Sequence, residues 1–163
     1  MATTKHIATI DGQTFTRNSK SRVYTHCVVA KPSIDHALAT AQSEGARDLY
    51  RCEYRWHQKA VTSGGRLFEQ SKHMTDEDYH EQCKRDLMFA RRALVGKQSE
   101  DDFVSYHVDD MLAWIEKQRE QGFYDRWVER GWNSRLDLAQ KLAATTRAHP
   151  YYGDVVILEA TQL

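Results

Sequence analysis

Polar and apolar residues alternate near the start of the chain in the way that strands require. The alternation over 5–10 predicts a strand, and the Asp11-Gly12 pair after it suits the positive φ angles of a type I′ turn. A second strand is expected over 13–17. After a polar loop at 18–21, the β-branched and aromatic run over 22–30 predicts a third strand. Together these segments predict a three-strand meander.

Side chains of the third predicted strand divide between two faces, because successive residues of a strand point in opposite directions. One face, which we expect to enter the core, carries Val23, Thr25, Cys27 and Val29. The opposite face carries Tyr24, His26, Val28 and Ala30.

Capping residues and glycines divide the middle of the chain into helices. Ser33 is a candidate N-cap for a helix over 34–61, with Gly45 as its expected weak point. Thr75 begins a second helix, which Gly96 ends. The apolar stripe of this second helix has helical spacing and comprises Tyr79, Cys83, Leu87, Ala90 and Leu94.

A third helix is expected to begin at Ser99 and to end at Gly122. Its buried side is expected to hold Phe103, His107, Met111 and Trp114. The connection that follows this helix is expected to contain Trp127 and Trp132.

The last helix is expected to open at Ser134 and to end by His149, because Pro150 disfavours helical geometry in the residue before it. The run over 154–160 predicts a closing strand that is apolar on both faces.

The whole pattern predicts an α+β fold, in which a small antiparallel sheet packs against about four helices. That sheet comprises the N-terminal meander and the C-terminal strand. The chain length predicts a single domain over residues 1–163.

The overall charge excludes a general attraction to nucleic acid or to an acidic membrane. The chain has 23 basic and 23 acidic residues, so an electrostatic function has to come from local patches.

The chain has an odd number of cysteines, namely Cys27, Cys52 and Cys83, which does not favour a disulfide framework. The sequence lacks an apolar signal run and an apolar stretch of membrane-spanning length, so we expect a cytoplasmic protein with no membrane partner.

Basic residues concentrate around the loop between the second and third strands. Guanidinium and ammonium groups pair with phosphates or carboxylates, and aromatic rings offer faces for stacking. We therefore expect a partner-binding site at the tip of a hairpin, formed by Arg17, Asn18, Ser19, Lys20, Ser21, Arg22, Tyr24 and His26. The alternative is a tip that is polar only because water solvates it.

A second basic feature lies on the first predicted helix, at four-residue intervals. It comprises Arg47, Arg51, Arg55 and Lys59. Residues at this spacing form one stripe on a helix, which would suit a phosphate backbone or an acidic groove of a protein. An ordinary solvated helix face is the alternative.

Enzymatic and metal chemistry are only weakly indicated. A set of zinc ligand types is present, but its spacing is not that of zinc sites, and the set consists of Cys52, His57, His80 and Cys83. No metal and no cofactor are therefore predicted. His107 lies near Asp109 and Asp110, as a general base would, yet it also falls on the expected apolar stripe.

The basic segment also resembles a known group of proteins. Its motif, Arg17-x-Ser19-x-x-Arg22-x-Tyr24-Thr25-His26-x-Val28-Val29, resembles the N-terminal hairpin of small uncharacterised proteins carried by bacteriophages, prophages and plasmids. The resemblance covers the first fifth of the chain. It implies a mobile-element origin, where small proteins without catalytic motifs often inhibit host defence, as anti-CRISPR proteins do.

Three functions fit these features. The first, which we favour, is a non-enzymatic protein that occludes a host protein or ribonucleoprotein complex engaged in nucleic-acid processing or defence. The second is direct binding of nucleic acid through the basic hairpin and the helix stripe. The third is a small enzyme with a scattered His/Asp site. The sequence gives no indication of the oligomeric state.

Overall fold

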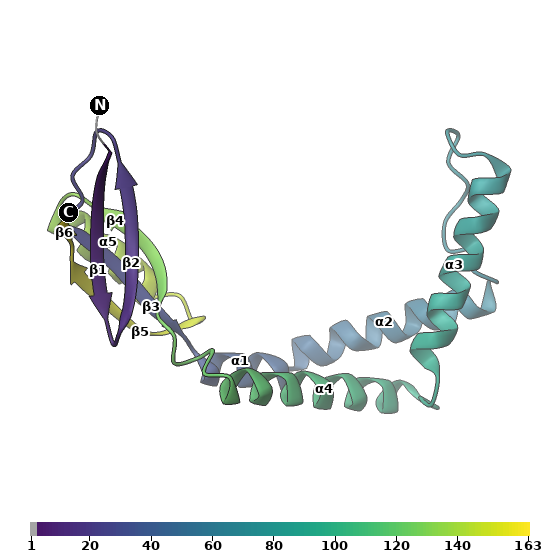
Figure 1. Ribbon diagram of the computed structural model, residues 1–163. Coiled ribbons are helices and arrows are strands. Elements are labelled where there is room, and N and C mark those ends of the chain that lie inside the picture. Colours follow the sequence, from purple (N-terminus) through teal and green to yellow (C-terminus); the bar gives the residue numbers. More distant parts are fainter. Residues whose placement is uncertain (1–2) are drawn as a thin grey trace. The chain divides into compact units, whose positions relative to one another are not determined.

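The contacts within the chain divide it into two units in the computed structural model, which describes residues 3–163 (Figure 1). The sheet unit comprises the chain up to Ala39 and from Trp114 onwards, and the helical unit comprises Thr40–Ala113. The fold class is α+β, as predicted. The expectation of one domain over residues 1–163 stays a prediction.

The N-terminal alternation forms a hairpin. Strands β1 (Thr4–Ile10) and β2 (Gln13–Ser19) pair antiparallel, and the turn between them has positive φ at Asp11 (46°) and Gly12 (76°). These two angles confirm the predicted type I′ geometry. Strand β6 (Thr161–Gln162) pairs with the other edge of β1, which gives a first sheet of order β2-β1-β6.

Strand β3 (His26–Pro32) lies in a second sheet, between β4 (Val128–Asn133) and β5 (Tyr152–Glu159). The predicted three-strand meander is therefore wrong, because β3 does not pair with β2. Burial explains the difference. The four residues from Cys27 to Ala30 are all 0% exposed, so β3 requires a strand at each edge and cover on both faces. The mostly exposed β2 cannot supply that cover.

Two hydrophobic clusters bury the two faces of β3. Helix α5 (Leu136–Arg147) covers one face, where the cluster comprises Val28, Ala30, Ala139, Ala143 and Val155. The first sheet covers the other face, where the cluster comprises Ala8, Cys27, Val29 and Trp127. The expectation that a single face of β3 enters the core is thus incomplete. Val23 and Thr25, expected in the core, are exposed because they precede the strand.

Trp127 attaches the hairpin turn to the second sheet. Its indole Nε1 donates a hydrogen bond to Asp11 Oδ2 at 2.9 Å, and its backbone N donates to Gln13 Oε1 at 2.7 Å. Lys31 Nζ lies 4.7 Å from the centroid of the Trp127 ring. The residues after Trp127 form β4, although a connection was expected there. The strand has no sequence signal because Val-Glu-Arg-Gly-Trp-Asn shows no clear alternation of polar and apolar residues.

N-capping residues determine where several of the helices begin. The described helices before β4 are α1 (Ile34–Ala41), α2 (Glu44–Thr62), α3 (Asp76–Leu94) and α4 (Glu100–Glu120). Ser33 and Thr75 cap α1 and α3 as predicted, each accepting a bond from a backbone N–H three residues on. The long first helix breaks before Ser43, which caps α2, rather than at Gly45. Ser99 forms a reciprocal capping box with Asp102 at the start of α4.

The helical unit has a thin core. Helix α3 packs against α2 through the cluster Ala60, Leu67 and Ala90. On α4, Phe103 is fully buried, but Met111 and Trp114 are 38% and 53% exposed, so their expected burial is wrong. The sequence of α4 contains two adjacent apolar stripes, and the buried one continues from Val104 through Val108 and Ile115.

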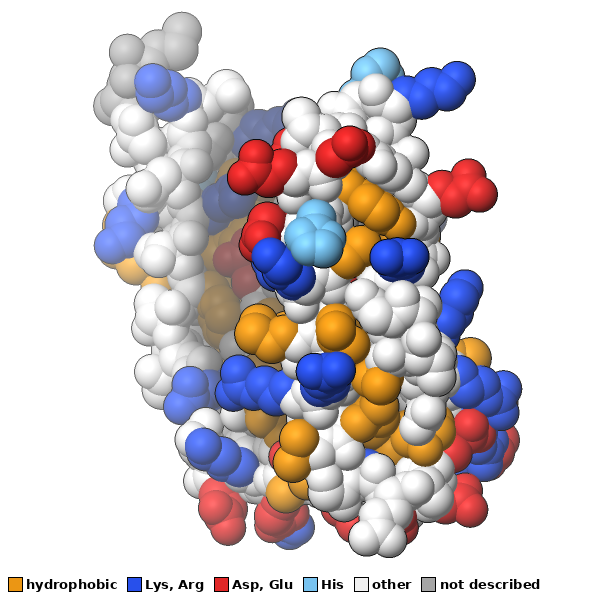
Figure 2. Space-filling view, turned by 90° about the vertical axis from the view of Figure 1, so that its right-hand side faces the viewer, with side chains coloured by type: hydrophobic (Ala, Val, Ile, Leu, Met, Phe, Trp, Pro, Cys, Tyr) orange, Lys and Arg blue, Asp and Glu red, His pale blue; other side chains and the backbone are white. Residues whose placement is uncertain are grey.

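Large hydrophobic side chains remain on the surface of the helical unit. Figure 2 shows hydrophobic side chains gathered on one face, with Lys and Arg side chains among them. The large exposed hydrophobic residues of α3, its flanking segments and α4 include Phe68, Met88, Phe89, Val95 and Tyr106. None of the helices within residues 3–163 combines the length and the apolar character needed to cross a membrane.

Substitutions at the adjacent glycines Gly64 and Gly65 would test how closely α3 packs on the loop after α2. Gly65 has φ +87°, and a Cβ at this position would overlap the carbonyl oxygen of Cys83, whereas Gly64 has φ +66° and open space around it. We expect Gly65→Ala to lower the free energy of unfolding by more than about 3 kcal/mol and Gly64→Ala by only about 1 kcal/mol. Urea denaturation followed by circular dichroism measures both. Equal losses would contradict the close approach at Gly65.

The buried thiol of Cys27 is expected to make the sheet unit less stable as the pH rises through the alkaline range. Burial raises the pKa of its thiol to about 12, and the nearby Glu129 carboxylate adds to the shift. The unfolded chain therefore loses this proton first, so the contribution is full below the ordinary cysteine pKa and is lost as pH rises towards about 12. We expect the unfolding free energy to fall less steeply across this range in Cys27→Ala than in the wild type. The control Cys52→Ala, at an exposed thiol, should keep the wild-type slope.

Candidate functional site

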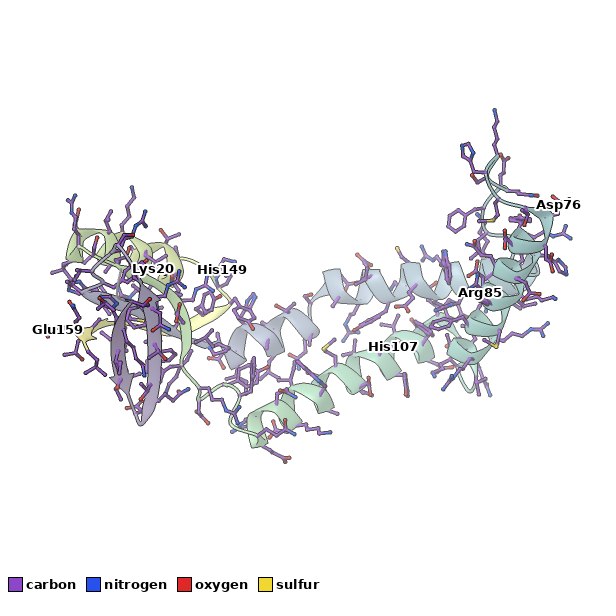
Figure 3. The ribbon with its side chains drawn as sticks, turned by 45° about the horizontal axis from the view of Figure 1, so that its top comes forward. Lys20, Asp76, Arg85, His107, His149 and Glu159 are labelled. Atoms are coloured by element: carbon purple, nitrogen blue, oxygen red, sulfur yellow. The ribbon has the colours of Figure 1, made fainter. Side chains whose placement is uncertain are left out.

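The basic segment is not a hairpin tip but a connection between the two sheets. Arg17, Asn18 and Ser19 end β2, and the chain reaches β3 only at His26. Ser19 Oγ accepts hydrogen bonds from the backbone N of Ser21 at 3.4 Å and of Arg22 at 2.8 Å. This turn fixes the direction in which the chain leaves β2. Lys20 is exposed in the same turn (Figure 3).

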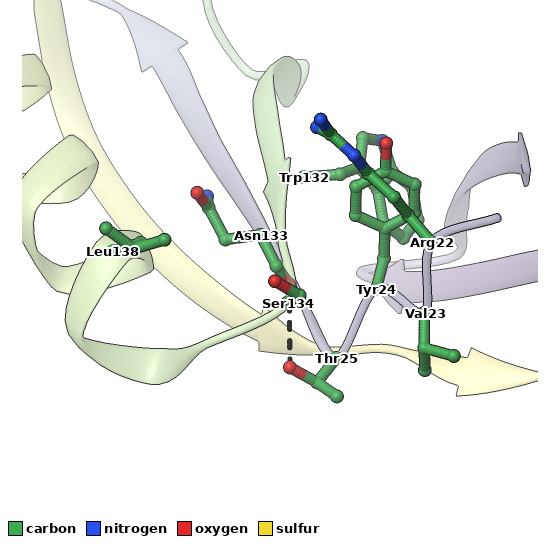
Figure 4. A pocket seen from close by; sticks show the side chains of 8 residues that line it. All are labelled: Arg22, Val23, Tyr24, Thr25, Trp132, Asn133, Ser134 and Leu138. Atoms are coloured by element: carbon green, nitrogen blue, oxygen red, sulfur yellow. Dashed lines mark hydrogen bonds between the residues drawn. The ribbon is translucent and has the colours of Figure 1, made fainter.

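The connection forms one wall of a pocket of about 470 Å³, which we call the Arg22 pocket (Figure 4). Its lining residues are Arg22, Val23, Tyr24, Thr25, Trp132, Asn133, Ser134 and Leu138. Thr25 ties the two walls together, because its backbone N donates to the carbonyl oxygen of Asn133 at 3.0 Å. The close-up shows Arg22, Tyr24 and Trp132 grouped on the side opposite Leu138.

A row of rings supports the Arg22 pocket from inside the sheet unit. The Tyr24 ring makes edge contacts with His6 and Trp132, at centroid distances of 5.3 and 6.3 Å. His6 is fully buried on β1, and its Nδ1 lies 3.3 Å from the carbonyl oxygen of Arg17. Tyr24 is therefore held half-buried by packing, with its position set before any ligand arrives.

Two residues that line the Arg22 pocket, Trp132 and Asn133, each carry a hydrogen-bond donor that lacks a partner within residues 3–163. Among the described residues, nothing accepts a bond from Trp132 Nε1 or from Asn133 Nδ2, although both atoms are buried. No described carboxylate forms an ion pair with Arg22. An unpaired buried donor costs about 1–3 kcal/mol, and a ligand whose acceptor atoms reached these two donors would relieve this cost. The pocket is chemically suited to an anion.

Only one wall of this site is predicted from the sequence. The predicted residues include Arg22 and Tyr24 but not Trp132 and Asn133, which lie more than a hundred residues further along the chain. His26 shares a hydrogen bond with Thr25 Oγ1 at 2.8 Å and does not line the Arg22 pocket. The sequence offers one sign of this second wall: the indole of Trp132 and the amide of Asn133 are adjacent in an otherwise polar segment.

The basic stripe on α2 lies in the helical unit, and two of its four cations are paired with carboxylates. Arg51 pairs with Glu44 and Asp48, and Arg55 makes a bidentate pair with Glu100 at 3.0 Å for each bond. The Glu44 and Asp48 hydrogen bonds hold the pKa of Arg51 above its ordinary value, and those of Glu100 do the same for the pKa of Arg55. The two remaining members of the stripe, Arg47 and Lys59, are exposed. The predicted stripe thus offers fewer free cations than its spacing indicates.

The candidate catalytic group of the third function shows no hydrogen bonds among its members in the described part of the chain. The His107 ring stacks on Tyr50 with a centroid distance of 5.1 Å, and no hydrogen bond within the described chain joins it to Asp109 or Asp110. Both aspartates are exposed on α4. Within residues 3–163, no three or more His, Cys, Asp or Glu residues come together in a group that could hold a metal ion.

The pair between Arg55 and Glu100 gives a testable electrostatic prediction. Glu100→Gln removes the bridge between α2 and α4, so we expect a small drop in the melting temperature at low salt that disappears at about 1 M salt, where screening is strong. Asp101→Asn is the control, because it removes a carboxylate from the same first turn without an ion pair. Thermal melts at the two salt concentrations measure the difference. Identical behaviour of the two variants would show that the bridge contributes nothing.

Comparison with known proteins adds no assignment to this geometry. No family model, no curated protein and no solved structure matches the chain. The function has to be inferred from the chemistry of the site itself.

Proposed function

We propose that this chain is a non-enzymatic binding protein that holds an anionic group of its partner in the Arg22 pocket. The observation that carries the proposal is the pair of buried, unpartnered donors on Trp132 and Asn133, beside a guanidinium that has no described carboxylate partner. A carboxylate or phosphate oxygen is the acceptor that such a set of donors binds best. Tyr24 adds a half-buried ring at the edge of the pocket.

The partner in this proposal is a host protein or ribonucleoprotein complex that processes nucleic acid or serves in defence. The resemblance of the Arg17–Val29 motif to phage, prophage and plasmid proteins supports this choice, and an anti-CRISPR-like inhibitor is the corresponding function. Such an inhibitor acts by occlusion, for which a rigid surface with complementary charge is sufficient. The bacterial cytoplasm is where it would meet that partner.

Direct binding of nucleic acid is the second candidate, and one observation favours it. Arg17, Lys20 and Arg22 follow one another at the edge of the sheet unit, and Tyr24 presents part of its ring in the same connection. Cations on phosphates and a ring beneath a base form a combination typical of proteins that bind single strands. In this version the Arg22 pocket receives a backbone phosphate.

Phosphate binding tests the proposal directly. We expect inorganic phosphate to raise the melting temperature of the wild-type protein and to lose most of this effect in Arg22→Gln, because that change removes the only guanidinium lining the pocket. Arg17→Gln is the matched control, since Arg17 lies in the same segment but does not line the pocket. Equal responses of the two variants, or no response of the wild type, would overturn the assignment of the site.

A labelled single-stranded oligonucleotide then separates the two candidates. Steeply salt-dependent binding that requires Arg22 supports direct recognition of nucleic acid. Phosphate binding without oligonucleotide binding supports a protein partner that presents a carboxylate or phosphate group. Fluorescence anisotropy at two salt concentrations provides the measurement.

A further inference from the structure

The helical unit contains a second pocket, of about 350 Å³, formed where α2, α3 and α4 meet. We call it the Arg92 pocket. Two of its walls are aromatic: Phe89 on α3 is 67% exposed and Tyr106 on α4 is 51% exposed. Two ring side chains left this open beside a cavity provide apolar surface that a bound ligand could bury.

Positive charge at the Arg92 pocket exceeds negative charge. Arg92 and Lys97 line it, and neither forms an ion pair with a described carboxylate. Lys97 Nζ lies 3.9 Å from the centroid of the Tyr106 ring, which holds the ammonium group over an aromatic wall. Glu53 is the one acidic residue among the lining residues, and its carboxylate is directed to a histidine rather than to these cations.

That histidine, His57, provides an independent sign of a missing partner. It is only 3% exposed, and its Nε2 lies 3.5 Å from Glu53 Oε1. Its Nδ1 is buried and has no hydrogen-bond partner within the described part of the chain. A buried ring nitrogen without a partner is unfavourable, and His57 is one of the residues that line the pocket.

The floor of the Arg92 pocket is held in place by packing. His107, on α4 (Figure 3), is stacked on Tyr50 with an interplanar angle of 18°. Its ring centroid lies 4.3 Å from that of the buried Phe103. Phe103 in turn contacts His57. These ring contacts between α2 and α4 hold the two lining histidines, His57 and His107, in place, which reduces the cost of ordering them when a ligand binds.

We infer that the Arg92 pocket binds a small aromatic carboxylate. The ring of the ligand contacts Phe89 and Tyr106, and its carboxylate pairs with Arg92 and Lys97. A volume of about 350 Å³ is at the lower end of that found for small-molecule sites and accommodates a fused two-ring compound. This inference does not depend on the proposed function, because the two pockets share no residue.

Isothermal titration with 1-naphthoate, and with the uncharged 1-naphthamide as its isosteric partner, tests the inference. We expect 1-naphthoate to bind and 1-naphthamide to bind at least about tenfold more weakly, because the amide has no negative charge and only one acceptor oxygen for the guanidinium and ammonium groups. Arg92→Gln should weaken 1-naphthoate to a similar degree. Arg91→Gln, a change at the neighbouring exposed cation that does not line the pocket, should leave its affinity unchanged.

Two further variants decide which pocket is responsible. Arg22→Gln should leave the affinity for 1-naphthoate unchanged, because that arginine lines the other pocket. Lys97→Gln should weaken binding as Arg92→Gln does. The inference is overturned if 1-naphthoate fails to bind, if the amide binds equally well, or if Arg91→Gln and Arg92→Gln have the same effect.

Discussion

The burial of β3 on both faces is the constraint on which the sheet unit depends. Four consecutive residues with no exposed surface require two neighbouring strands and two covering layers, and the chain supplies them as β4, β5, α5 and the first sheet. Small residues make this possible, because alanines on α5 and β1 allow those layers to approach closely. The same arrangement brings the end of β4 beside Thr25, and this contact creates the Arg22 pocket.

The features that the sequence predicted correctly are those decided by near neighbours. The turn at Asp11-Gly12 and the caps at Ser33, Thr75 and Ser99 each depend on residues no more than a few positions apart. The partner strands of β3 and the second wall of the Arg22 pocket depend on contacts across about a hundred residues or more. No local pattern encodes those contacts. The wrong buried stripe on α4 has a different cause, since two adjacent stripes there are both apolar.

The neutral overall charge is compatible with the two proposed anion sites, because the acidic residues form more ion pairs and helix-terminal contacts than the cations at the two pockets do. Six acidic residues lie in the first turns of α3 and α4, where the helix dipole stabilises them, and one of these, Glu100, also pairs with Arg55. Glu44 and Asp48 pair with Arg51. Arg22, Arg92 and Lys97 remain without such partners among the described residues. The net charge therefore does not indicate how many cations are available for binding. The contacts of each charged side chain do.

The order of segments along the chain has a consequence for synthesis. Strand β3 precedes the whole helical unit, whereas β4 and β5, which pair with it, both follow that unit. A ribosome therefore completes every residue of the helical unit before β3 has a strand to pair with. Non-local pairing of this kind is slow, and an apolar strand with free edges is prone to pair with other chains. The segment that organises the finished sheet unit is also the one most exposed to mispairing while the chain is being made.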